Sequence, residues 1–145
     1  RAYREAIALR PNRPAAYFSL GAALANSGHD VEAAQRFLEA KERHQVGSEG
    51  WADAMAVAFQ MLQLEECAEV AKPEWWNDEG LKALSARVVR ATPNQQIANC
   101  MRAHVLSGLL ADAWEVGTRS AAELKEAAAH FDRSAVLCYA PVQKA

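Results

Sequence analysis

The side chains that could do chemistry in this sequence are a few histidines, cysteines and carboxylates. Cys100 and His104 stand four residues apart, a spacing that puts two potential metal ligands on one face of a helix. No further cysteine or histidine is close enough in sequence to complete a ligand set. His29 and Asp30 are adjacent, as an acid–base pair could be, but they fall in a short turn where we expect Asp30 to cap the next helix. We therefore interpret both pairs as structural.

Other reactive patterns are missing from the sequence. Cys67, Cys100 and Cys138 include no CxxC pair, which favours three reduced thiols and a reducing compartment, cytoplasmic or organellar. The adjacent acidic residues at 65–66 and 78–79 are typical of solvated helix ends. The sequence has no P-loop, dinucleotide-binding, HExxH, nucleophile-elbow or EF-hand pattern. We predict that the protein is not an enzyme and that it has no cofactor and no metal.

Composition and charge limit the classes of partner. The sequence has 145 residues, 51% of them hydrophobic and 23% charged, which is typical of one water-soluble domain with a substantial core. Its 16 Lys and Arg against 18 Asp and Glu give a formal net charge of −2, and neither half has a basic excess, so we expect no nucleic-acid partner. The longest apolar runs, such as 55–59, are far shorter than the roughly 20 residues that cross a bilayer, so we expect a protein that does not span a membrane.

The elements that would position these residues are helices. Ala, Leu, Glu, Gln and Arg dominate, and apolar residues recur every three or four positions, so the sequence predicts an all-α fold. The short breaks leave about six full helices and an initial partial one, about six to seven in all, with neighbours antiparallel. These breaks lie at 11–14, 26–28, 44–47, 72–73, 92–94 and 117–120.

The sequence predicts two kinds of helix end, a capping box at an N-terminus and glycines at C-termini. Ser120 and Glu123 are spaced as a capping box, in which each side chain accepts a hydrogen bond from the backbone N–H of the other residue. Gly28 and Gly117 suit the left-handed conformation that ends a helix. We expect a helix to begin after Ser120 and helices to end at both glycines.

An internal repeat indicates the architecture. Small side chains at Gly21 and Ala33 would let two helices approach closely, with larger residues on either side. The unit 14–47 resembles the tetratricopeptide repeat, whose period is about 34 residues. This resemblance implies a solenoid of α-α hairpins in a right-handed superhelix, and it rests on Tyr17, Leu20, Gly21, Leu24, Ala33, Phe37 and Ala40.

The resemblance weakens away from this unit. We predict one helical repeat domain over 1–145, in which 1–13 is the end of a truncated repeat and 14–47 the regular one. The stretches 48–93 and 94–141 are then degenerate, lengthened repeats, and we expect a short extra helix within 64–76. Because the chain opens in mid-repeat, we expect it to be a piece of a longer protein.

The resemblance also implies a concave binding surface lined by the first helix of each hairpin. The family members that capture chaperone C-termini need a Lys and two Asn, where this chain has Phe18, Ser19 and Ala22. A groove of small apolar residues suits a helix or an extended apolar segment better. The candidate partner-binding residues are Phe18, Ala22, Asn26, Ala52, Ala56, Phe59 and Gln60.

Two alternatives stay open for the aromatic residues. Phe18 and Phe59 could pack against neighbouring helices instead of lining a groove. Trp75 and Trp76 are adjacent, and two neighbouring residues of a helix point about 100° apart. We expect one of the two tryptophans to face the core and the other to be a partner contact.

These patterns favour a non-catalytic scaffold that binds a partner peptide, helix or subunit through a helical-repeat surface. One alternative is a structural linker subunit of a large, possibly organellar, assembly. A second alternative is an accessory or regulatory domain of an enzyme whose catalytic part lies outside these residues.

Overall fold

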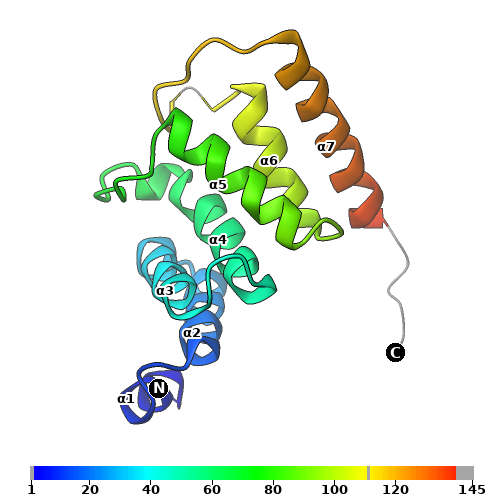
Figure 1. The fold of residues 1–145 in the computed structure, drawn as a ribbon. Coiled ribbons are helices and arrows are strands. Elements are labelled where there is room, and N and C mark those ends of the chain that lie inside the picture. Colours follow the sequence, from blue (N-terminus) through cyan, green and yellow to red (C-terminus); the bar gives the residue numbers. More distant parts are fainter. Residues whose placement is uncertain (1, 111, 140–145) are drawn as a thin grey trace. The chain divides into compact units, whose positions relative to one another are not determined.

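The computed structural model describes residues 2–110 and 112–139, so residues 1, 111 and 140–141 of the predicted repeats lie outside the described ranges. Within them the chain has seven α-helices, one turn of 3-10 helix and no strand, which confirms the predicted all-α fold (Figure 1). The extra helix expected within 64–76 is the 3-10 turn η1. The elements are α1 (Ala2–Leu9), α2 (Pro14–Asn26), α3 (Asp30–Arg43), α4 (Glu49–Leu62), η1 (Glu65–Cys67), α5 (Asp78–Ala91), α6 (Gln96–Ser107) and α7 (Ala121–Tyr139).

The chain forms two compact units, residues 1–74 and residues 75–145. In the first unit each of the helices α1 to α3 packs against the next helix in the sequence, and η1 contacts α3. In the second unit α6 packs against both α5 and α7, most extensively against α7. Short connections explain the contacts of α1 to α4 and of α5 with α6, because consecutive helices that are joined by a few residues fold back on one another. The contact between α6 and α7 forms across a long connection, residues 108–120.

The closest helix approach in the first unit is between α2 and α3. Gly21 is buried on α2, and a Cβ atom added to it would lie 2.9 Å from Cε1 of Phe37 on α3. Phe37 is 2% exposed and Ala33 is fully buried. Gly28 follows α2 with a φ of 81°, the left-handed conformation that favours glycine. The predicted close contact at Gly21 and the predicted helix end at Gly28 are both confirmed.

Two predicted helix ends are wrong. Asp30 is the first residue of α3, one position inside the expected cap, and the flanking His29 makes no side-chain capping bond. The Asp30 carboxylate still lies in the first turn, where the partial positive charge of the helix N-terminus favours it. Gly117 has no left-handed φ; α6 ends instead at Gly108, with a φ of 71°, and a long connection follows.

The capping box at the start of α7 is confirmed in both directions. The backbone N of Glu123 donates to Ser120 Oγ over 3.1 Å, and the backbone N of Ser120 donates to Glu123 Oε1 over 3.0 Å. Two further caps were missed in the sequence: Ser48 accepts from the N–H of Trp51 at the start of α4, and Asn77 caps α5. A Ser or Asn before a helix is a signal that could have found both.

We expect Ser120→Ala to lower the free energy of unfolding by about 1 kcal/mol, because an N–H in the first turn of α7 loses its acceptor. Urea denaturation followed by circular dichroism measures the change. Ser27→Ala is the control, since Ser27 is exposed and its side chain caps no helix. Equal stability of the two variants would show that the capping box contributes nothing.

Candidate functional site

The predicted partner-binding residues of α2 are only partly accessible. Asn26 is exposed, whereas Phe18 and Ala22 are half-buried. The ring of Phe18 meets the ring of Phe37 edge to face, with centroids 5.1 Å apart, and packs against the buried cluster that contains Tyr17. The structure therefore shows that Phe18 packs against a neighbouring helix, which was one of the two alternatives for this residue. A partner contact on the same face of α2 stays a prediction.

The four candidate partner-binding residues of α4 also differ in how exposed they are. Ala52, Ala56 and Phe59 are buried, with exposed fractions of 0, 2 and 1%. Gln60 is exposed. A side chain without exposed surface offers a partner nothing to contact, so only Gln60 is accessible in this conformation. The partner-binding role of α4 stays a prediction.

The two adjacent tryptophans precede α5 and do not belong to a helix. Trp76 is buried, and its Nε1 donates to the carbonyl of Ala113 over 2.9 Å. Its ring meets the ring of Trp114 edge to face at 5.9 Å, whereas Trp75 is half-buried with its ring 6.1 Å from that of Trp76. Trp76 therefore takes the core position and Trp75 the more exposed one. Trp114 was missed because nothing near it in the sequence signals a contact with Trp76.

Cys100 and His104 do meet on α6, with Sγ and Nδ1 3.4 Å apart. Burial raises the pKa of the Cys100 thiol, and a hydrogen bond with Ser134 opposes this only in part. Burial likewise lowers the pKa of His104. Both groups are therefore neutral near pH 7, and a neutral thiol beside a neutral imidazole is not an activated nucleophile. Among the described residues no three His, Cys, Asp or Glu side chains are grouped to hold a metal ion.

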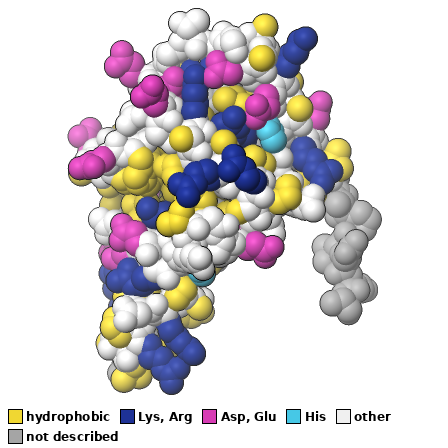
Figure 2. All heavy atoms as spheres, in the orientation of Figure 1, with side chains coloured by type: hydrophobic (Ala, Val, Ile, Leu, Met, Phe, Trp, Pro, Cys, Tyr) yellow, Lys and Arg dark blue, Asp and Glu magenta, His cyan; other side chains and the backbone are white. Residues whose placement is uncertain are grey.

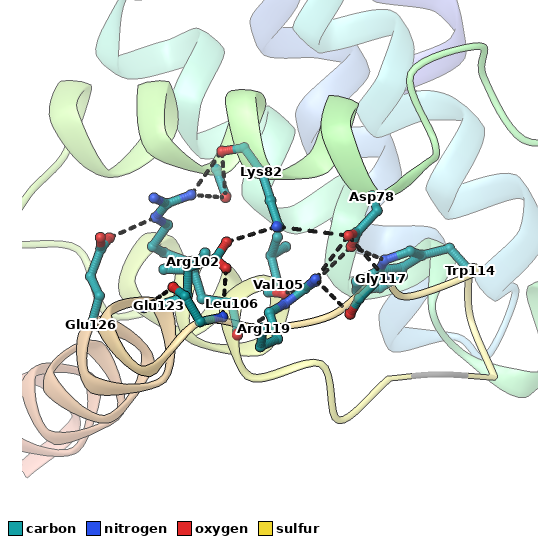
Figure 3. Close-up of polar contacts among 12 residues, drawn as sticks. Asp78, Lys82, Arg102, Val105, Leu106, Trp114, Gly117, Arg119, Glu123 and Glu126 are labelled. Atoms are coloured by element: carbon teal, nitrogen blue, oxygen red, sulfur yellow. Dashed lines mark hydrogen bonds and ion pairs between the residues drawn. The ribbon is translucent and has the colours of Figure 1, made fainter.

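The densest polar cluster of the second unit surrounds Asp78, the first residue of α5 (Figure 3). Both carboxylate oxygens of Asp78 accept from Arg119, over 2.5 Å from Nη2 and 2.8 Å from Nη1. Trp114 Nε1 and the backbone N of Gly117 donate to the same carboxylate, each over 3.1 Å. The hydrogen bonds from Arg119, and then those from Trp114 and Gly117, hold the pKa of Asp78 well below its usual range despite partial burial.

Arg119 connects three segments of the second unit through this contact. Its guanidinium is only 6% exposed and also donates to the carbonyls of Val105 over 2.9 Å and Leu106 over 3.1 Å. Those carbonyls belong to the last turn of α6, which lacks intrahelical donors. Arg119 therefore links the α6–α7 connection to the end of α6 and to the start of α5. We call the cluster of Asp78, Trp114, Gly117 and Arg119 the Asp78 clamp. We interpret it as structural, because the charges of Asp78 and Arg119 are already paired.

Beyond the clamp, partly exposed ion pairs join α7 to α5 and α6. Lys82 lies 2.7 Å from Glu123, and this hydrogen bond, with the N–H of Ser120, lowers the pKa of Glu123 to about 2. Arg102 lies 2.9 Å from Glu126 (Figure 3). Burial raises the pKa of the Glu126 carboxyl, but the hydrogen bonds and charges of Arg102 and His130 outweigh it and lower the pKa overall.

Two depressions formed by described residues are candidate binding surfaces, one in each unit. The α1–α2 depression has a volume of about 290 Å³ and is lined by Ala6, Leu9, Arg10, Arg13, Ala15 and Ala16. The Asn99 depression has a volume of about 390 Å³ and is lined by Val89, Pro93, Asn94, Asn99, Ala129, His130 and Arg133.

Comparison of the chain with family models, with curated proteins and with solved structures finds no match. Among the described helices, none combines the length and the apolar character that a bilayer span requires.

Proposed function

We propose that this protein is a non-catalytic scaffold that binds a helix or peptide of a partner protein. The observation that carries the proposal is the α1–α2 depression, which combines an apolar floor with unpaired basic side chains. The resemblance of 14–47 to the tetratricopeptide repeat supports it, because such repeats bind partners through helix faces.

The floor of the depression fits the apolar side of a helix. Leu9 is 82% exposed on α1, and burying a leucine stabilises a complex by about 1.5–3 kcal/mol. The neighbouring floor residues are alanines, whose small side chains allow a partner backbone to come close. Ala15 on α2 shares a helical face with Phe18, Ala22 and Asn26, at offsets of three, seven and eleven residues. The predicted partner-binding residues of α2 therefore lie on the helical face that also lines the depression.

The charges of the depression indicate an acidic partner. Within the described residues the side chains of Arg10 and Arg13 make no hydrogen bond or ion pair. Arg4, in contrast, is paired with Glu32 over 3.3 Å. Figure 2 shows basic and hydrophobic side chains side by side over α1. A second copy docked here across a two-fold axis would put like charges together, so an amphipathic helix with carboxylates beside its apolar stripe fits better.

We expect the double variant Arg10→Glu/Arg13→Glu to bind such a helix at least tenfold more weakly than the unaltered chain. The probe is a fluorescent peptide with Leu and Ala on one helical face and Glu on the other, titrated with the chain and followed by anisotropy. Raising the salt concentration weakens this binding, because the carboxylates face exposed arginines.

The control is Arg90→Glu/Lys125→Glu, which changes the net charge equally at two exposed positions outside the depression. It should bind the acidic peptide as the unaltered chain does, and circular dichroism should show all three proteins equally helical. Unaltered binding to the Arg10/Arg13 variant would rule out this face. A full chain that forms no saturable complex with this peptide, and none with a protein co-purified from its native source, would contradict the scaffold itself.

A further inference from the structure

The Asn99 depression lies in the second unit, between the end of α5, the turn that follows it, the start of α6 and the middle of α7. Its lining shares no residue with the α1–α2 depression or with the Asp78 clamp. Val89, Pro93 and Ala129 supply apolar walls, and the remaining lining residues are Asn94, Asn99, His130 and Arg133. Such a mixture of apolar walls and a few polar groups is typical of small-ligand sites.

The side chain of Asn99 is the buried polar group of this depression, and its orientation is set by hydrogen bonds. It is 2% exposed, and its Nδ2 donates to the carbonyls of Pro93 over 3.0 Å and Gln95 over 2.9 Å. These two bonds set the orientation of the amide and leave Oδ1 as an acceptor. Nδ1 of His130 lies 2.9 Å from this oxygen, so Nδ1 carries a proton and donates. The imidazole is thus held in one orientation by a buried amide.

Arg133 is oriented by a neutral group as well. Its Nη2 donates to Oδ1 of Asn94, and no carboxylate within the described residues pairs with it. Arg102 and Arg119, two less exposed arginines of the second unit, are both paired with carboxylates. Arg133 is therefore held in place while its positive charge is left uncompensated.

The donors around Arg133 are suited to an anion. A guanidinium has five N–H groups, and the contact with Asn94 uses one of them. Because Asn94 accepts through Oδ1, its Nδ2 group is left to donate from the same side. Glu126 lies about two helical turns before Arg133 on α7, and its carboxylate already contacts Arg102 and His130. The exposed Asp132 is adjacent to Arg133 in the helix and therefore points about 100° away.

We propose that the Asn99 depression binds a small anionic group, a carboxylate or a phosphate. Arg133 provides the charged contact, and Asn94 orients Arg133 and adds a neutral N–H donor. Asn99 and His130 form the rigid wall behind the anion. A bidentate guanidinium contact is the strong form of this interaction, and pre-orientation reduces the entropy that binding costs.

The test is a nuclear magnetic resonance titration of the full chain with sodium acetate and, separately, with sodium phosphate, against sodium chloride at equal ionic strength and pH. Either anion should produce saturable shifts of the Arg133 Nε–H signal and of the side-chain amide signals of Asn94 and Asn99. Comparing the two anions shows whether a carboxylate or a phosphate is preferred. We expect Arg133→Gln to weaken the binding at least tenfold and Asn94→Ala to weaken it severalfold.

The matched control is Arg90→Gln, which removes an exposed arginine of α5 that does not line the depression. It should leave the titration unchanged. Because Arg133 is exposed, its replacement should preserve the amide spectrum, and retained dispersion of the signals checks this. Shifts that fail to saturate with both anions, or equal affinity of the Arg133→Gln variant, would overturn the site. Neither result bears on the peptide titration at Arg10 and Arg13, so the scaffold proposal is judged separately.

Discussion

Replacing Asp78 by Ala lowers the free energy of unfolding by about 3 kcal/mol, the low end of the range for removing one partner of a buried ion pair. The variant leaves the guanidinium of Arg119, only 6% exposed, without its carboxylate. It also removes the acceptor of the Trp114 and Gly117 N–H groups, so the α6–α7 connection loses its attachment to α5. Urea denaturation at pH 7 measures the change.

A double-mutant cycle separates the ion pair from the rest of the contact. If the unpaired charge causes the loss, Asp78→Ala/Arg119→Met should be less destabilised than the sum of the two single variants. Arg4→Gln is the reference for an exposed pair, because Arg4 and Glu32 are about half exposed, and it should change stability by less than about 1 kcal/mol. An Asp78→Ala variant as stable as Arg4→Gln would show that the clamp is dispensable.

The same contact makes stability depend on pH in a defined direction. The pKa of Asp78 is depressed in the folded chain, mainly by Arg119, so its contribution is complete above the unfolded pKa of about 3.9. It is lost as the pH falls below that value. The unaltered chain should therefore lose more stability than Asp78→Asn between about pH 5 and pH 2.

Replacing Gly21 by Leu destabilises the first unit by about 1–2 kcal/mol. The new Cβ would lie 2.9–3.1 Å from three ring atoms of Phe37, and the rest of the side chain would push the two helices apart. Overpacking of this kind costs about 1–3 kcal/mol, from which the better helix propensity of leucine subtracts about 1 kcal/mol or less. Thermal and urea denaturation measure the net effect.

Ala15→Leu provides the matched control, because it enlarges an exposed residue of the same helix and should change stability by less than about 0.5 kcal/mol. Adding Phe37→Ala to Gly21→Leu removes the opposing ring. The double variant should then be more stable than the sum of the single effects predicts. An unchanged melting temperature for Gly21→Leu would contradict the close packing of α2 on α3.

Much of the fold could be predicted because it depends on residues close together in sequence. The glycines and prolines between helices mark the breaks, and the capping box of Ser120 and Glu123 needs only three residues of spacing. The close approach at Gly21 could be predicted because both helices and the turn between them lie within 14–47. The sequence indicated small Ala33 for this approach, whereas the structure places the ring of Phe37 against Gly21. Local propensity and a short connection are enough for such features.

The clamp and the Asn99 depression could not be predicted in this way. Asp78 and Arg119 are 41 residues apart, and a sequence with balanced charges offers many equally good partners for each. The connection after α6 has no periodicity to show where it turns, which is why the end of the helix at Gly108 was missed. The burial of Phe59 likewise follows from packing that its position in a repeat does not determine.

The division into two units also gives each unit its own optical reporter. Trp51 is the tryptophan of the first unit and is 3% exposed, whereas the buried tryptophans Trp76 and Trp114 belong to the second. Replacing Trp51 by Phe therefore leaves tryptophan fluorescence that comes only from the second unit. The edge-to-face rings of Trp76 and Trp114 should also give that unit a near-ultraviolet dichroism band of its own. Denaturation of the second unit can thus be followed by itself in the Trp51→Phe variant, without any attached label.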